Sequence, residues 1–190
     1  KKNFHNSKIN LICISRIHFR KGIKYLLNVY NQLEKKFPNN FKLTIVGACT
    51  SAKGFDITKT NSKVVFLGVK NKSLIKKELL NSDIFILPSL EEGQALVIGE
   101  ALAHGLPIIS TPFSGAKDYI LDEKLLQYAL NNYSLQIVNP FDMNKFYTAI
   151  LNLSNKEIYK KASNIAIQIA LQNTWYFSGM EFVKIIESLD

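Results

Sequence analysis

The chain has 190 residues, of which 47% are hydrophobic and 21% are charged, a balance that excludes a disordered, collagen-like or coiled-coil protein. Lys and Arg total 24 against 15 Asp and Glu, and the net charge of +9 favours an anionic partner, such as nucleic acid, a membrane surface or a phosphate-bearing ligand. The length predicts a single domain over residues 1–190.

Short apolar runs alternate with helical periodicity along the chain. The predicted strands cover 8–15, 41–46, 63–67, 83–87, 107–110 and 135–138, and the predicted helices cover 22–37, 72–80, 94–104, 116–121, 143–153, 156–171 and 175–188. Alternation of this kind is typical of a parallel sheet covered on both faces. The sequence therefore predicts an α/β fold, a Rossmann-like doubly wound parallel sheet with helices on both faces and a helical C-terminal extension. Ligands bind such sheets at the carboxyl ends of the strands.

The loop after the first predicted strand concentrates positive charge. It contains Arg16, Arg20 and Lys21, and Arg16 and Arg20 are the only arginines of the chain. Arginine presents a planar fork that suits phosphate, and Lys21 adds a point charge, while Gly22 lets a helix begin close to a ligand. A solvated basic loop explains these residues equally well. Neither GxxxxGK nor GxGxxG occurs, so ATPase and dinucleotide functions have no motif support.

The segment PSLEEGQALVIGEALAHGLP, residues 88–107, is the most informative stretch. It predicts a helix that begins near Gly93, whose first backbone amides (Gly93, Gln94 and Ala95) would favour an anion. Glu92 stands at the lip of this anion site. Glu100 lies about two turns into an otherwise apolar helix and needs a partner or a ligand hydroxyl. The alternative is that Glu100 faces solvent and Glu92 is an ordinary N-cap acid.

The spacing of the two glutamates bears on the reaction. Six residues of helix rise about 9 Å, which places the carboxylates of Glu92 and Glu100 roughly 10 Å or more apart. This separation disfavours a glycosidase pair, which needs roughly 5–9.5 Å. Sugar hydroxyls at Glu92, a diphosphate at the cations and amides, and ribose hydroxyls at Glu100 together describe a nucleotide sugar.

The cysteines and histidines predict no metal site. Cys13 and Cys49 lie in apolar, strand-like contexts and are expected to be reduced, buried thiols. His5, His18 and His104 lack the spacing of metal ligands, and no role is assigned to them. No apolar run approaches the roughly 18 residues of a membrane span, and the start lacks a signal core, so a cytoplasmic protein is expected.

These motifs, in order, resemble the C-terminal, donor-binding half of group 1 (family 4) retaining glycosyltransferases with the GT-B fold. The E-x7-E pattern from Glu92 to Glu100 resembles that family's donor motif, and ISRIHFRKGIKYLL resembles its Arg-x4-Lys-Gly segment. LTIVG, VVFLG, SDIFILPS, GAKDYI and IVNPFD match its later segments, so that the resemblance covers residues 8–188. Two departures are Gln94-Ala95 in place of an aromatic-Gly pair, and Asp118 in place of a glutamate.

The resemblance implies roles for individual residues. Arg16 and Lys21 would hold the diphosphate and stabilise the leaving nucleotide, and Glu92 would bind the donor sugar, which makes these three the expected catalytic residues. Glu100 would bind the ribose, and the further donor-binding positions are Gly93, Gln94, Ala95 and Leu96. The donor would be a UDP- or GDP-linked sugar, with no metal and no other cofactor.

The resemblance also implies that an N-terminal acceptor domain is absent from these residues, so that the chain alone would bind donor without catalysing transfer. The acceptor would be a glycan or lipid-linked glycan of a cell-surface polysaccharide, with peripheral electrostatic contact at the inner face of the cytoplasmic membrane. Two alternatives stay open. One is a nucleotide-sugar sensor without transfer activity, and the other is a nucleic-acid-binding module, which the scarcity of arginine disfavours.

Overall fold

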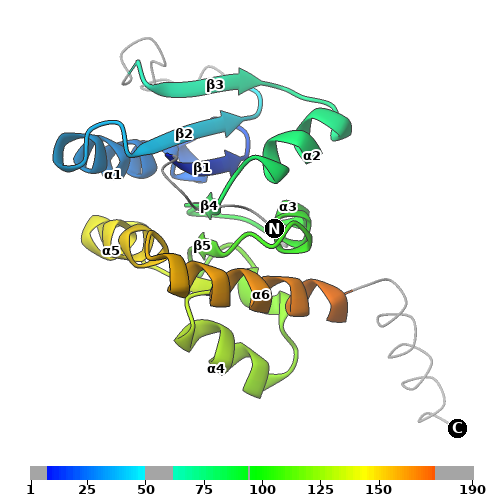
Figure 1. Cartoon of the computed structure of the whole chain (residues 1–190). Coiled ribbons are helices and arrows are strands. Elements are labelled where there is room, and N and C mark those ends of the chain that lie inside the picture. Colours follow the sequence, from blue (N-terminus) through cyan, green and yellow to red (C-terminus); the bar gives the residue numbers. More distant parts are fainter. Residues whose placement is uncertain (1–7, 50–61, 94, 174–190) are drawn as a thin grey trace, which may run out of the picture.

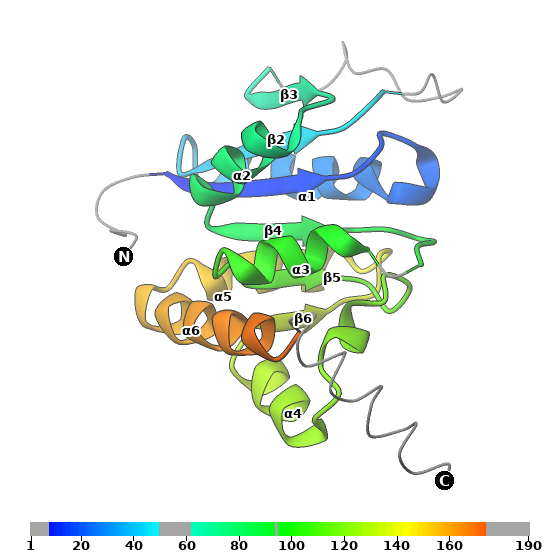
Figure 2. The ribbon, with the colours of Figure 1, turned by 90° about the vertical axis from the view of Figure 1, so that its right-hand side faces the viewer.

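The computed structural model describes residues 8–49, 62–93 and 95–173. Within them, six strands form one parallel sheet in the order β3-β2-β1-β4-β5-β6, of which Figure 1 labels β1 to β5 and Figure 2 also labels β6. The strands are β1 (Ile9–Ile14), β2 (Phe41–Val46), β3 (Val64–Gly68), β4 (Ile84–Leu87), β5 (Ile108–Ser110) and β6 (Leu135–Ile137). The predicted α/β class and parallel sheet are confirmed.

Helices cover both faces of this sheet (Figure 2). One face carries α1 (Ile23–Lys36) and α5 (Met143–Leu153), and the other carries α2 (Lys72–Leu80), α3 (Leu96–Ala103) and α6 (Lys156–Gln172), with α4 (Glu123–Asn131) beside β6. The two faces bury separate apolar clusters because side chains alternate along a strand. In β1, Leu11 and Cys13 join the cluster under α1 and α5, and Ile12 joins the other cluster. The doubly wound architecture is thus confirmed.

The strand order reverses between β1 and β4. The chain leaves β1 toward β2 and β3, then crosses back to place β4 on the other side of β1. Helices from the two directions lie on opposite faces at this switch, which leaves a crevice beyond the carboxyl ends of β1 and β4. The loops that follow these two strands therefore meet at one place.

Several predicted elements need correction. Helix α4 was not predicted, although Asp122 caps it by accepting a hydrogen bond from the backbone N–H of Leu125 at 2.7 Å. The expected helix over 116–121 is a 3₁₀ turn over Ala116–Tyr119. The expected burial of Cys49 is wrong, because β2 ends at Val46 and Cys49 lies beyond the sheet with an exposed thiol. The expected helix over 175–188 lies outside the described residues.

Candidate functional site

A cavity of about 730 Å³ opens at the carboxyl ends of β1 and β4. Two loops form most of its wall: the β1 loop, residues 15–22, and the β4 loop, residues 88–95. The lining residues are Ile14, Ser15, Arg16, His18, Arg20, Lys21, Leu87, Glu92, Ala95, Leu96 and Val97. Its position is the one expected of a ligand site in a doubly wound sheet.

The β1 loop lies directly against the β4 loop, and Gly22 makes this approach possible. Gly22 has a φ of +63°, and a Cβ atom there would stand 1.9 Å from the carbonyl oxygen of Pro88. The backbone N–H of Leu90 donates a hydrogen bond to the carbonyl oxygen of Arg20 at 2.7 Å. The reason for glycine at this position is thus contact with Pro88, whereas the sequence suggested contact with a ligand.

Lys21 and Glu92 form an ion pair inside the cavity. The Lys21 ammonium lies 2.5 Å from Glu92 Oε2, and it also donates to the carbonyl oxygen of Glu91 at 3.2 Å. Ser89 Oγ donates to the same Glu92 oxygen at 3.4 Å. Both charged side chains are largely buried, with exposed fractions of 20% for Lys21 and 23% for Glu92. The structure therefore brings two of the predicted site residues into direct contact.

The two arginines differ in their partners. Arg20 donates to the Glu91 carboxylate at 3.0 Å in an exposed ion pair. Arg16 is exposed at the cavity wall, and it has no ion-pair partner within the described ranges 8–49, 62–93 and 95–173. Three cationic side chains (Arg16, Arg20 and Lys21) line the cavity, and the carboxylates of Glu91 and Glu92 pair with two of them, which leaves an excess of one positive charge among the described residues. This electrostatic balance favours an anionic ligand.

Helix α3 begins at Leu96, later than predicted. Ala95 is its N-cap residue, with an extended backbone and a carbonyl oxygen that accepts hydrogen bonds from the Tyr119 hydroxyl at 3.0 Å and from the Ile98 N–H at 2.8 Å. The amides at the start of the helix that belong to cavity-lining residues are therefore those of Ala95, Leu96 and Val97, and not that of Gly93. The alternative that Glu92 is an ordinary N-cap acid is wrong, because the N-cap residue is Ala95.

The remaining predicted residues are spread around this helix. Gly93 is exposed and lies outside the cavity lining, and Gln94 lies outside the described residues. Glu100 is exposed and also stands outside the lining, so the structure does not bring it to the cavity wall. Its charge acts on Tyr119, where burial and then the Glu100 carboxylate raise the pKa of the hydroxyl.

Sequence reasoning gave no role to His18, which lines the cavity. His18 precedes the 3₁₀ turn Phe19–Lys21, and its Nδ1 accepts a hydrogen bond from the backbone N–H of Arg20 at 3.4 Å. It thereby helps to orient the loop that carries Arg20 and Lys21. The signal available in the sequence was His18 itself, because a histidine ring nitrogen can accept a backbone hydrogen bond and this residue directly precedes a short turn.

Among the described residues, no group of three or more His, Cys, Asp or Glu side chains gathers in a way that could hold a metal ion. No helix in the same residues is both long and apolar enough to cross a membrane.

Known proteins similar to this chain share its family. The family described as Glycosyl transferases group 1 matches residues 8–156. An uncharacterized glycosyltransferase of Haemophilus influenzae is 32% identical over an alignment of 162 residues, and the match covers 81% of this chain and 42% of that protein. One from Methanocaldococcus jannaschii is 27% identical over 82% of this chain and 42% of its own length. Protein CapJ of Staphylococcus aureus is 25% identical over 79% of this chain and 39% of its own.

Solved structures share the fold. The C-terminal domain of a glycosyl transferase group 1 family protein (LpcC) from Francisella tularensis has a TM-score of 0.71 at 18% identity, covering 88% of this chain and 86% of that one. An Escherichia coli trehalose-6-phosphate structure, bound with UDP-2-fluoro glucose, has a TM-score of 0.66 at 16% identity. The match covers 90% of this chain and 42% of that one.

The chain spans about two fifths of the length of the curated relatives that it matches. The family match nevertheless covers most of the described residues, including the β1 loop and the β4 loop that form the cavity. The parallel sheet and its switch point agree with the structures of GT-B glycosyltransferases. By sequence and by fold, the chain belongs to the group 1 glycosyltransferase family.

Proposed function

We propose that the cavity between the β1 and β4 loops binds a nucleotide-diphospho-sugar donor, UDP- or GDP-linked, for retaining and metal-independent transfer of the sugar to an acceptor. The observation that carries this proposal is the Arg16 guanidinium, which has no ion-pair partner among the described residues and lines the same cavity as the Lys21–Glu92 pair, at the switch point of the sheet. The excess of one positive charge among the described residues, carried by Arg16, suits an anionic diphosphate. The amides of Leu96 and Val97 supply further donors to phosphate oxygens.

The contacts of these residues indicate how they would act on a donor. Negative charge grows on the departing phosphate as the bond to the sugar breaks, and cations already in place stabilise that charge. Arg16 is available for this task without breaking an ion pair with a described residue. Lys21 is held by Glu92 and would share its charge with the phosphate, while Glu92 accepts hydrogen bonds from donor sugar hydroxyls. Glu100 would reach the ribose from its exposed position on α3.

The biological setting that we propose is synthesis of a cell-surface polysaccharide, with a glycan or lipid-linked glycan as the acceptor. The similarity to Protein CapJ of Staphylococcus aureus supports this setting. The similarity in fold to a protein bound with UDP-2-fluoro glucose supports a nucleotide-sugar donor.

Titration calorimetry with UDP-glucose and GDP-mannose tests the donor proposal. Arg16→Ala should weaken binding of the preferred donor about tenfold, because a charge-assisted hydrogen bond to phosphate is lost. Lys35→Ala is the matched control, since it removes one exposed cation from the far end of α1 and should leave affinity unchanged. Absence of binding to both donors, or equal affinity of Arg16→Ala and wild type, would overturn the proposal. Transfer assays on the complete enzyme would separate a transferase from a sensor that only binds.

A further inference from the structure

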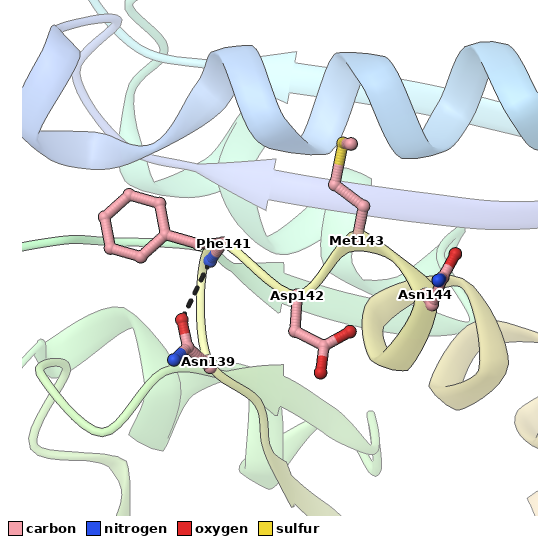
Figure 3. A pocket seen from close by; sticks show the side chains of 5 residues that line it. All are labelled: Asn139, Phe141, Asp142, Met143 and Asn144. Carbon is pink, nitrogen blue, oxygen red and sulfur yellow. Dashed lines mark hydrogen bonds between the residues drawn. The ribbon is translucent and has the colours of Figure 1, made fainter.

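A second cavity, of about 390 Å³, opens where β6 leads into α5 (Figure 3). Its lining residues are Asn139, Phe141, Asp142, Met143 and Asn144. We propose that this cavity binds an uncharged sugar ring of the acceptor glycan, which the ring of Phe141 stacks against. The acceptor role rests on the proposed function, whereas the sugar site itself rests on the contacts described next.

Phe141 supplies an exposed but fixed aromatic surface. Its side chain is 62% exposed and contributes to neither apolar cluster of the fold. Its ring nevertheless contacts Tyr25 of α1 edge to face, with ring centroids 5.3 Å apart and the planes perpendicular. The contact with Tyr25 restrains the ring while much of its surface stays open. Sugar rings present C–H groups along their faces, and a restrained aromatic ring is suited to pack against them.

The polar side chains around Phe141 suit hydroxyl groups. Asn139 Oδ1 accepts a hydrogen bond from the backbone N–H of Phe141 at 3.0 Å, which leaves the amide NH₂ of Asn139 available (Figure 3). Asn144 is exposed at the other end of the lining. A side-chain amide both donates and accepts hydrogen bonds, as a sugar hydroxyl does. An open cavity with one aromatic ring and two amides therefore matches a sugar better than an apolar ligand.

The charge of this cavity selects against an anion. The Lys145 backbone N–H, at 3.0 Å from Asp142 Oδ1, holds the pKa of that carboxyl below its usual value. Asp142 therefore carries negative charge at neutral pH and caps α5. The Lys145 ammonium, 3.4 Å from Asp142 Oδ2, balances this charge without leaving an excess of positive charge. The cavity between the β1 and β4 loops, called the donor cavity from here on, has in contrast an excess of one positive charge among the described residues. The two cavities thus differ in the ligand charge that they accept.

The two cavities adjoin the same end of α1. Lys21 of the donor cavity immediately precedes Gly22 and the start of the helix, and Tyr25 in its first turn contacts Phe141. Both cavities also lie beyond carboxyl ends of strands in one parallel sheet. A sugar held by Phe141 would therefore occupy the same edge of the molecule as the donor.

Nuclear magnetic resonance titration of the ¹⁵N-labelled 190-residue chain tests this assignment. The probes are the neutral disaccharides maltose, lactose and chitobiose, each added to about 100 mM, with affinities expected in the millimolar range. At least one probe should shift the side-chain amide signals of Asn139 and Asn144. Phe141→Ala should weaken that binding about tenfold, and Phe141→Tyr should preserve it. Tyr128→Ala removes a partly exposed aromatic ring from α4, away from this cavity, and should have no effect.

Three results would overturn the sugar site: no shift with any probe, unchanged affinity in Phe141→Ala, or tighter binding of glucose 6-phosphate than of the neutral sugars. Nucleotide-sugar titrations of the same sample distinguish this failure from failure of the donor proposal. Donor binding without disaccharide binding would overturn only the sugar site. Disaccharide binding without donor binding would confirm the sugar site and overturn its assignment to an acceptor.

Discussion

Replacement of Gly22 by alanine tests whether contact between the two loops builds the donor cavity. The φ of +63° costs a residue with a side chain about 1–2 kcal/mol. The added Cβ would also stand 1.9 Å from the Pro88 carbonyl oxygen, so the loops must separate. Separation breaks the hydrogen bond from Leu90 to Arg20, worth about 1 kcal/mol, and weakens the Lys21–Glu92 pair. We expect a loss of about 3–4 kcal/mol in the free energy of unfolding.

Gly68→Ala is the matched control for this variant. Gly68 has nearly the same backbone conformation, with a φ of +67°, but an added Cβ would meet nothing within 4 Å. Only the conformational cost applies, and a loss of about 1–2 kcal/mol is expected. Urea denaturation followed by circular dichroism measures both free energies. Equal losses in the two variants would refute the reasoning, because backbone strain alone would then account for the effect of Gly22→Ala.

Two further predictions concern the thiols and the start of α3. A thiol reagent at pH 8 should modify Cys49 rapidly and Cys13 only after unfolding, because Cys49 is exposed and burial raises the pKa of Cys13 to about 12. In the unfolded chain, the Cys13 thiol should lose its proton near the ordinary cysteine pKa of about 8.5. The contribution of Cys13 to the free energy of unfolding should therefore fall as the pH rises above that pKa. Equal reaction rates of both thiols in the folded protein would contradict this assignment. Tyr119→Phe removes the hydrogen bond to the Ala95 carbonyl and should cost about 1 kcal/mol in urea denaturation, whereas unchanged stability would show that the bond does not support the N-cap of α3.

The sheet and most of its helices follow from local sequence patterns. Short runs such as 41–46 and 83–87 are mostly apolar because the strands are buried on both faces, and Gly47 and Pro88 directly follow them. The loops after β1 and β4 were expected to meet because carboxyl ends of parallel strands share one edge. Arg16, Lys21 and Glu92 accordingly line the same cavity, as expected.

Features that depend on tertiary contact could not be predicted from these patterns. Helix α3 begins two residues later than predicted, and the carbonyl of its N-cap residue Ala95 accepts a hydrogen bond from Tyr119, which lies 24 residues away in sequence. The apolar context of Cys49 suggested burial, although the strand that precedes it ends too early to bury it. Two contacts join segments that lie far apart in sequence: Gly22 with Pro88, and Phe141 with Tyr25. No local sequence pattern predicts either contact.

A crystal structure of the chain with its preferred donor, UDP-glucose or GDP-mannose, tests the central claim most directly. The account predicts the diphosphate within hydrogen-bond distance of Arg16 and Lys21, the donor sugar beside Glu92, and phosphate oxygens facing the amides of Leu96 and Val97. A diphosphate bound elsewhere, with the Arg16 guanidinium free and the Lys21–Glu92 pair unchanged, would contradict it.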